Sequence, residues 1–302
     1  MPAVDASRTR ALLVLVAGAC AIAFAPIFVR LTGTGPAAAG FWRLALALPA
    51  LAAMAALSAR REPGGSAGLS RMTVLAGLFF AGDLAFWHYA IRFTTVANAT
   101  ILANLSPIFV TVGAWMILRE RPRRLFLAGL ALALAGGWAI AAARVSGPGL
   151  DPPLGDAFGA GTALWYAGYM LVVRRARAVQ SASRIMLWSS AVGAPILLLV
   201  ALGLGERVVP ATPGGWLACL GLAAVHVTGQ GAIAWALGRL PAAVASVVIL
   251  VQPVVAAVLG WLIFGEAMTG VQMLGGMVAL AGVVLAQLAA ARRPTPTSNV
   301  TL

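Results

Sequence analysis

The chain consists of long apolar runs separated by short segments rich in arginine, glycine and proline. Runs of about 17 to 25 apolar residues can cross the hydrocarbon core of a bilayer as helices. No connection between the runs is long enough to hold a soluble domain. The pattern predicts ten transmembrane helices, at residues 11–30, 36–58, 72–92, 96–118, 125–143, 156–174, 184–204, 214–237, 241–264 and 270–290. The expected fold class is an all-α membrane protein.

Composition agrees with this interpretation. The 302 residues are 61% hydrophobic and 10% charged, whereas a soluble domain is about 25% charged. The net charge of +13 would suit a nucleic-acid-binding protein. However, the basic residues lie in short clusters between apolar runs, where the positive-inside rule puts them. We therefore expect a lipid bilayer and no nucleic acid as partner.

The arginines predict the orientation of the chain. With the N-terminus in the cytoplasm, 16 of the 21 arginines fall in cytoplasmic segments. Arg30, Arg92, Arg144 and Arg207 fall outside, and Arg43 lies within a span. This asymmetry places both termini in the cytoplasm, as an even number of spans requires.

The two halves of the sequence repeat one another. A constant offset of 146 residues, without a gap, relates tryptophan, proline, glutamate and glycine positions of the two halves. The matched pairs include Trp42 and Trp188, Pro107 and Pro253, Trp115 and Trp261, Glu120 and Glu266, Gly129 and Gly275, and Gly136 and Gly282. We predict two five-helix units, 1–146 and 147–302. Since five is odd, the units enter the membrane from opposite sides, as in inverted-repeat transporters that work by alternating access.

Both halves also carry a longer pattern, "YAIRFTTVANATILANLSPIFVTVGAWMILRE" and "WALGRLPAAVASVVILVQPVVAAVLGWLIFGE". It combines an aromatic–alanine pair, small residues, a proline within the helix and a terminal glutamate. The pattern resembles the EamA family of the drug/metabolite transporter superfamily, and in particular amino-acid exporters of the YddG type. The resemblance covers nearly the whole chain. It implies a ten-helix carrier without cofactors, in the bacterial inner membrane, that exports amino acids or related metabolites.

The third run contains the polar stretch "DLAFWHYAIR", residues 83–92. A charge at the bilayer centre costs about 3 to more than 10 kcal/mol, so such residues face a cavity or a partner. Asp83 and Trp87 share one helix face, and His88 lies about 100° further round. We predict that all three contact the substrate: Asp83 would recognise a substrate amine or exchange a proton, and His88 could act as a proton site if water reaches it. The alternatives are a structural hydrogen bond or ion pair for Asp83 and a neutral, helix-bridging role for His88.

The second half lacks an acid and a histidine at the corresponding positions but supplies His226 and Gln230, one turn apart. This asymmetry favours substrate contact, because scaffold residues tend to be common to both repeats. We therefore expect the third and eighth spans to face one another.

The fourth and ninth spans are predicted to be paired walls of the binding site. Their polar candidates are Thr100, Asn104, Ser246 and Gln252. The small residues around them would equally serve close helix packing. Pro107 and Pro253 each remove a backbone hydrogen bond and should kink their helices. We predict that these two prolines are gating hinges.

Aromatic residues and one arginine complete the candidates. Trp165 and Tyr169 lie one turn apart in the sixth span and could bind an apolar side chain or an ammonium group. Their alternative is the aromatic belt at the membrane surface. Arg43 either reaches the outer surface or pairs with Asp83 or a substrate carboxylate. Glu120 and Glu266 recur at span ends, so we interpret them as structural.

Several function classes lack the residues that they need. The chain has no lysine and no nucleotide-binding motif, and its two cysteines do not form a metal-ligand set, so we expect no metal and no enzyme activity. The remote alternative is an intramembrane aspartyl protease that uses Asp83. A broader alternative is an exporter of sugars, nucleosides or cationic compounds. Whether protons are the coupling ion stays open at this point.

Overall fold

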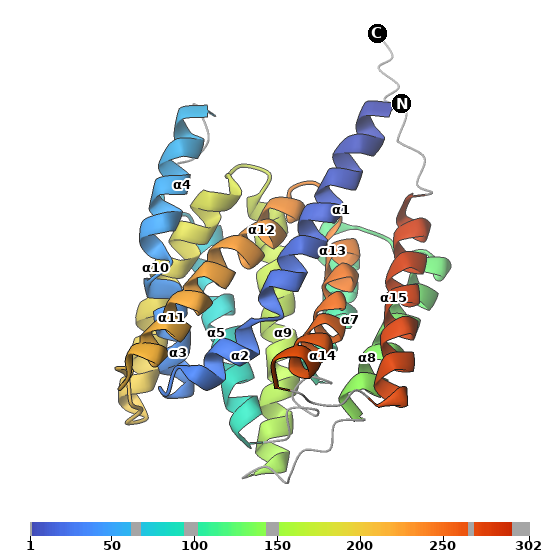
Figure 1. Ribbon diagram of the computed structural model, residues 1–302. Coiled ribbons are helices and arrows are strands. Elements are labelled where there is room, and N and C mark those ends of the chain that lie inside the picture. Colours follow the sequence, from blue (N-terminus) through green and yellow to red (C-terminus); the bar gives the residue numbers. More distant parts are fainter. Residues whose placement is uncertain (1, 62–67, 94–101, 143–150, 265–268, 292–302) are drawn as a thin grey trace.

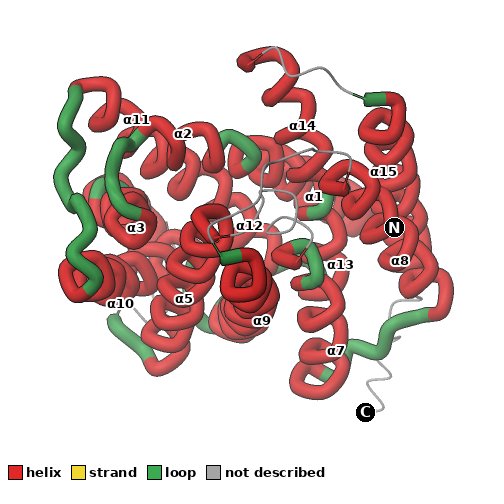
Figure 2. Tube along the Cα trace, turned by 90° about the horizontal axis from the view of Figure 1, so that it is seen from below, coloured by secondary structure: helices red, strands yellow, loops and turns green. Residues whose placement is uncertain are grey.

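The computed structural model describes residues 2–61, 68–93, 102–142, 151–264 and 269–291, and within these ranges the chain is helical with short connections (Figures 1 and 2). The first-half helices are α1 (Pro2–Ile22), α2 (Ala25–Leu31), α3 (Pro36–Ala45), α4 (Leu48–Arg61), α5 (Arg71–Phe93), α7 (Ser106–Leu118) and α8 (Arg124–Ala142). The second-half helices are α9 (Pro152–Ala176), α10 (Ala182–Gly203), α11 (Pro213–Val225), the π-helix η1 (His226–Gln230), α12 (Gly231–Leu237), α13 (Ala242–Ile249), α14 (Val251–Phe264) and α15 (Gly270–Ala291).

The helices follow the apolar runs, and several runs are divided into two shorter helices. The fourth and ninth spans are interrupted at residues 104–105 and at Leu250, positions that the repeat offset relates (104 + 146 = 250). Pro107 is the second residue of α7 and Pro253 the third residue of α14. A proline cannot donate a backbone hydrogen bond to the preceding turn, so the helix breaks just before it. The expected distortion is therefore present at both prolines.

Helices α8 and α15 pack against each other in opposite directions through small residues. A Cβ atom added at Gly136 would lie 2.3 Å from the backbone nitrogen of Ala279, and one added at Gly282 would lie 2.3 Å from that of Ala133. The repeat offset exchanges these two contacts, because it maps Ala133 onto Ala279 and Gly136 onto Gly282. The two helices therefore make equivalent contacts with each other at this interface.

Two further sets of helix contacts follow the same exchange. Helix α9 packs against α5. The repeat relates α9 to α1 and α5 to the segment that contains α12, and α1 and α12 also pack against each other. Helix α7 packs against α9, while α13 and α14 pack against α1. In Figure 2, α9 lies in the middle of the bundle, and it contacts α5, α7, α12 and α13. The two halves therefore interlock instead of standing side by side.

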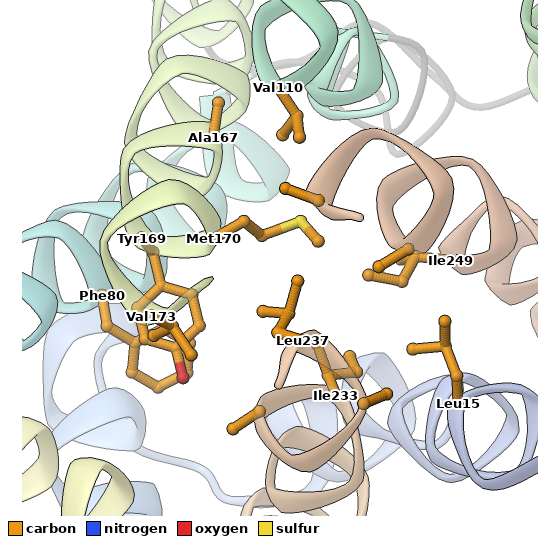
Figure 3. Packing of buried hydrophobic residues seen from close by; sticks show 14 of the residues in the cluster. Leu15, Phe80, Val110, Ala167, Tyr169, Met170, Val173, Ile233, Leu237 and Ile249 are labelled. Atoms are coloured by element: carbon orange, nitrogen blue, oxygen red, sulfur yellow. The ribbon is translucent and has the colours of Figure 1, made fainter. Parts of the chain in front are cut away.

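Apolar side chains from both halves fill the region around α9. Figure 3 shows Met170 extending between Val110, Leu237 and Ile249, which belong to three other helices. Phe80 and Tyr169 lie together at one side of this cluster. Several buried polar side chains, among them Arg43, Asp83, His226 and Gln230, come from the neighbouring elements α3, α5 and η1.

The surface has the character of a membrane protein. Large apolar side chains such as Leu13, Met116, Leu199 and Leu217 are each at least 66% exposed, whereas the interior holds many alanines and several polar residues. In the described residues, five helical segments are long and apolar enough to cross a bilayer: Ala6–Leu31, Pro36–Ala59, Arg71–Phe93, Ala182–Gly203 and Pro213–Leu237. Shorter apolar helices accompany them. The chain is therefore a multi-pass membrane protein, and the count of ten spans stays a prediction.

Candidate functional site

The polar residues of α5 are buried, as the sequence predicts. Asp83 is 9% exposed and His88 3% exposed. His88 Nδ1 lies 2.6 Å from the backbone oxygen of Pro36. Because a carbonyl can only accept, this nitrogen carries the proton and donates. His88 Nε2 has no hydrogen-bond partner in the described part of the chain. The histidine therefore joins α5 to the first turn of α3, which matches the helix-bridging alternative.

Arg43 of α3 lies in the interior with Asp83. Its side chain is 3% exposed, so it does not reach the outer surface. The guanidinium carbon is 5.8 Å from the centre of the Phe80 ring. Arg43 and Asp83 interact electrostatically, but they form no direct ion pair among the described residues. An arginine and an aspartate thus share one interior region without touching.

Two tyrosines of α9 border this region. Tyr169 is fully buried, with its ring centre 4.7 Å from that of Phe80, and the Tyr166 ring stacks beside it at 6.1 Å. Both hydroxyls are within electrostatic range of Asp83 and Arg43. Tyr169 therefore lies beside Asp83 of α5, and its role in substrate binding stays a prediction.

Trp165 has a different environment. Its indole packs where a side chain on Gly82 would be, since a Cβ atom there would lie 2.4 Å from the ring. The rings of Phe79 and Phe86 are at 5.6 and 5.9 Å. Trp165 therefore packs between α5 and α9, because the absence of a side chain at Gly82 leaves room for its ring.

The second-half residues enter the site on a π-helical turn, η1. His226 is fully buried, its Nε2 is 2.9 Å from Ser190 Oγ of α10, and its ring stacks on Phe80 at 5.2 Å. Phe80 and His226 are repeat mates (80 + 146 = 226), so the third and eighth spans meet at equivalent positions. Single π-turns inside helices are frequent at functional sites.

Gln230 ends the same turn. It is buried, and its side-chain amide lies near the hydroxyls of Tyr166 and Tyr169. The amide nitrogen nevertheless meets no hydrogen-bond geometry with a described residue. Gln230 thus faces the same region as Asp83 and Arg43. We call the set Arg43, Asp83, Tyr166, Tyr169, His226 and Gln230 the polar centre.

The remaining candidates lie elsewhere. Asn104 is beside α8, where its Nδ2 atom would be 3.7 Å from a Cβ atom on Gly137. Ser246 donates to the backbone of its own helix, to Ala243 O at 2.8 Å. Gln252 is half-buried on α14, and Trp87 has its ring 5.2 Å from that of His88. Thr100 and Glu266 are outside the described residues. Within the described residues, none of these four forms a hydrogen bond or ring contact with the polar centre.

A second polar cluster lies where α3 begins. Glu206, in the connection from α10 to α11, accepts hydrogen bonds from Ala37 N at 3.2 Å and Ala38 N at 2.9 Å, and Tyr89 of α5 donates to it. A carboxylate at a helix N-terminus satisfies free backbone donors and the helix dipole. We call Glu206, Tyr89 and the first turn of α3 the Glu206 clamp; it joins the two halves.

Sequence reasoning missed Glu206, Ser190 and Phe80, noted Tyr166 without including it among the binding residues, and left Arg43 undecided. Phe80 carried a detectable signal, because the repeat offset pairs it with His226. Glu206 carried none, since its repeat mate is an arginine, Arg60. Glu120, interpreted as structural, lies 3.6 Å from Arg174 of α9 and connects the ends of α7 and α9. Within the described residues, no three His, Cys, Asp or Glu side chains gather as metal ligands would.

Comparison with known proteins gives a family and a fold. The EamA-like transporter family matches the chain twice, over residues 9–142 and 153–288. A protein known from its crystal structure has the same fold, with a TM-score of 0.73 over 94% of this chain and 98% of that one, at 22% identity.

Individual relatives are transporters. A protein of Archaeoglobus fulgidus described as an uncharacterized transporter is 31% identical over 199 residues, which are 65% of this chain and 69% of the relative. The pseudopaline exporter CntI of Pseudomonas aeruginosa is 27% identical over 208 residues, 68% of this chain and 71% of the exporter. The chain belongs to the EamA-like transporter family of the drug/metabolite transporter superfamily.

Proposed function

We propose that the chain is a secondary carrier that exports amino acids or related small metabolites across the bacterial inner membrane by alternating access. It has ten membrane spans in two inverted units, 1–146 and 147–302, with both termini in the cytoplasm. The family matches support this division, because they leave residues 143–152 between them. The carrier uses no cofactor and does no chemistry on its substrate.

The observation that carries the proposal is the exchange symmetry between the halves. Equivalent helices α8 and α15 run in opposite directions and present the same contacts to each other. A pair of related units with opposite directions is what an inverted repeat requires. Two such units can exchange conformations, giving outward and inward states of similar free energy.

The placement of the helix ends supports an even number of spans. The first turns of α1 and the last turns of α15 lie at the same end of the bundle (Figure 1). Arg8 Nη2 lies 3.5 Å from the backbone oxygen of Gln287, across these two helices. In the predicted topology most arginines lie in segments on the same side as the two termini, which favours the cytoplasm for this end of the bundle.

The substrate enters the polar centre in this proposal. Arg43, Asp83, Tyr166 and Gln230 offer charged and hydrogen-bonding groups beside the aromatic ring of Phe80. Such a mixture suits a small polar molecule with an apolar part. The relative that is a pseudopaline exporter supports export as the direction. His88, Asn104, Ser246 and Gln252 line the path on either side in this proposal.

Pro107 and Pro253 act as hinges in this proposal. Each follows an interruption in its helix, at positions that the repeat relates. Broken helices at equivalent places let half-helices swing while the rest of each unit stays packed. The Glu206 clamp holds one end of the bundle closed, so it has to open in one half of the cycle.

Uptake into proteoliposomes tests the function. Labelled phenylalanine, leucine, glutamate and arginine are supplied with and without a proton gradient. We expect saturable uptake of at least one of them, reduced about tenfold or more by Asp83→Asn because the buried charge is lost. Acceleration by the gradient would make protons the coupling ion. Absence of uptake of every amino acid by folded protein would reject amino acids in favour of sugars, nucleosides or cationic compounds.

A further inference from the structure

Arg43 is a buried residue whose side chain has many hydrogen-bond donors to satisfy. It is 3% exposed and lies in a membrane-spanning helix segment, Pro36–Ala59. A guanidinium has five N–H donors and no acceptor, and burial removes the water that would satisfy them. Arg43 makes no hydrogen bond to a described residue, and its buried Nε is without a partner. Its surroundings therefore leave the donors of Arg43 unused.

Asp83 does not satisfy these donors. The two side chains interact electrostatically but form no direct ion pair in the described structure. Asp83 itself makes no hydrogen bond to a described residue. A buried pair held only for stability would gain most from direct, bidentate contact. The separation instead leaves a cation and an anion that can each take a further partner of opposite charge.

The other groups around Arg43 cannot act as its counter-ion. Phe80 offers the face of its ring at 5.8 Å, and Tyr166 and Tyr169 offer neutral hydroxyls. His88 donates its proton to Pro36, and His226 is hydrogen-bonded to Ser190. The repeat mate of Arg43 is Ser189, which bonds within its own helix to Met186 O at 3.2 Å. The repeat architecture therefore does not need an arginine here.

We propose that Arg43 binds the carboxylate of the transported molecule and that Asp83 binds its ammonium group. The substrate class is then a small zwitterion whose side chain packs against Phe80, Tyr166 and Tyr169. The planar fork of arginine matches the two oxygens of a carboxylate. This assignment rests on the proposed transport function and narrows it to molecules with both charges.

Matched ligands test the assignment without changing the protein. Phenylalanine, leucine and arginine are each compared with their amides, which keep the ammonium group and lack the carboxylate. Binding to detergent-purified protein is measured by calorimetry, and competition by uptake of the labelled acid into proteoliposomes. We expect the acid to bind at least about tenfold more tightly than its amide, as a charge-assisted bidentate contact gives.

Variants then assign the preference to Arg43. Arg43→Gln should weaken binding of the acid about tenfold or more, leave the amide nearly unchanged and so abolish the preference. Arg43→Lys keeps the charge without the fork and should retain part of it. The control is Arg30→Gln, which removes an exposed arginine of α2 and should keep the full preference.

The outcomes separate the two proposals. If the natural chain takes up an amino acid but binds its amide equally well, the Arg43 assignment is wrong and the transport function stands. A folded Arg43→Gln protein that keeps the preference also overturns the assignment. If no amino acid is bound or taken up, the proposed function fails and the assignment fails with it. Should Arg43→Gln not fold, the acid–amide comparison in the natural chain still decides.

Discussion

The interface between α8 and α15 and the polar centre are built on opposite principles. At the interface, glycine and alanine of one half meet alanine and glycine of the other, and exchanging the halves restores the same contacts. In the polar centre, Asp83 corresponds to Gly229 and Arg43 to Ser189, so exchanging the halves changes the chemistry. One region is symmetric and apolar, and the other is asymmetric and charged.

This difference separates scaffold from function. Symmetric contacts can be remade in both states of a carrier, because each half takes the place of the other. A substrate, by contrast, has two unlike ends and is best bound by unlike residues. The shared feature is the stacked pair Phe80 and His226, which lies where the two halves meet. We infer that the asymmetric residues around this pair determine what is carried.

The largest expected effect comes from blocking the symmetric interface. Gly282→Leu places a large side chain where a Cβ atom alone would lie 2.3 Å from a backbone nitrogen. Backbone cannot move aside as a flexible side chain can, so we expect a loss of about 3 kcal/mol or more in the free energy of unfolding. Denaturant titration in mixed micelles measures it. Unchanged stability would show that the two helices do not pack as described.

A sharper test uses the symmetry itself. Gly136→Ala and Gly282→Ala introduce the same 2.3 Å contact from opposite sides. Their losses in unfolding free energy should agree within about 0.5 kcal/mol. Gly137→Ala is the matched control, because its nearest neighbour would be a side-chain atom at 3.7 Å. Unequal losses for the pair would contradict the exchange symmetry of the interface.

The Glu206 clamp provides an asymmetric counterpart with a smaller effect. Glu206→Ala removes the acceptor of two backbone donors and of Tyr89, which should cost about 2 kcal/mol. Tyr89→Phe removes one donor and should cost about 1 kcal/mol. Thermal unfolding of the two variants measures both. A larger loss for Tyr89→Phe than for Glu206→Ala would reverse the assigned roles.

The hinge prolines should affect transport more than stability. Pro107→Ala restores a backbone donor next to a break in the helix, so stability should stay the same or rise slightly. The uptake rate should fall about three- to tenfold if the break is needed for gating. Pro195→Ala is a control on the exposed side of α10, where a proline lies inside a continuous helix. Equal rates for both variants would remove the hinge role.

Periodicity and repetition allowed much of the fold to be predicted. They allowed few of the individual side-chain contacts to be predicted. The runs at 72–92 and 184–204 became α5 and α10 almost residue for residue, because unbroken apolar runs leave the backbone no alternative in a bilayer. The breaks before Pro107 and Pro253 followed from proline chemistry. The π-turn at His226 could not be predicted in this way, because the equivalent residues of the first half, 80–84, form ordinary α-helix.

Tertiary contacts explain the details of the site that the sequence left open or missed. Trp165 is predicted to line the binding site; in the structure its ring packs into the space at Gly82 on the neighbouring helix, a contact that no local pattern indicates, and its binding role stays a prediction. Arg43 could be assigned to the surface or the interior until α3 was placed against α5 and α10. Glu206 acts on a helix start some 170 residues away in sequence, and no local pattern connects the two.

The most direct test of the central claim compares the two regions in one assay. Initial rates of amino-acid exchange, per folded molecule, are measured in proteoliposomes for the natural chain, Asp83→Asn and Gly136→Ala. The account predicts at least a tenfold loss of rate for Asp83→Asn with nearly unchanged thermal stability, and lower stability with most of the rate retained for Gly136→Ala. A folded Asp83→Asn protein that exchanges amino acids at the natural rate would contradict the account.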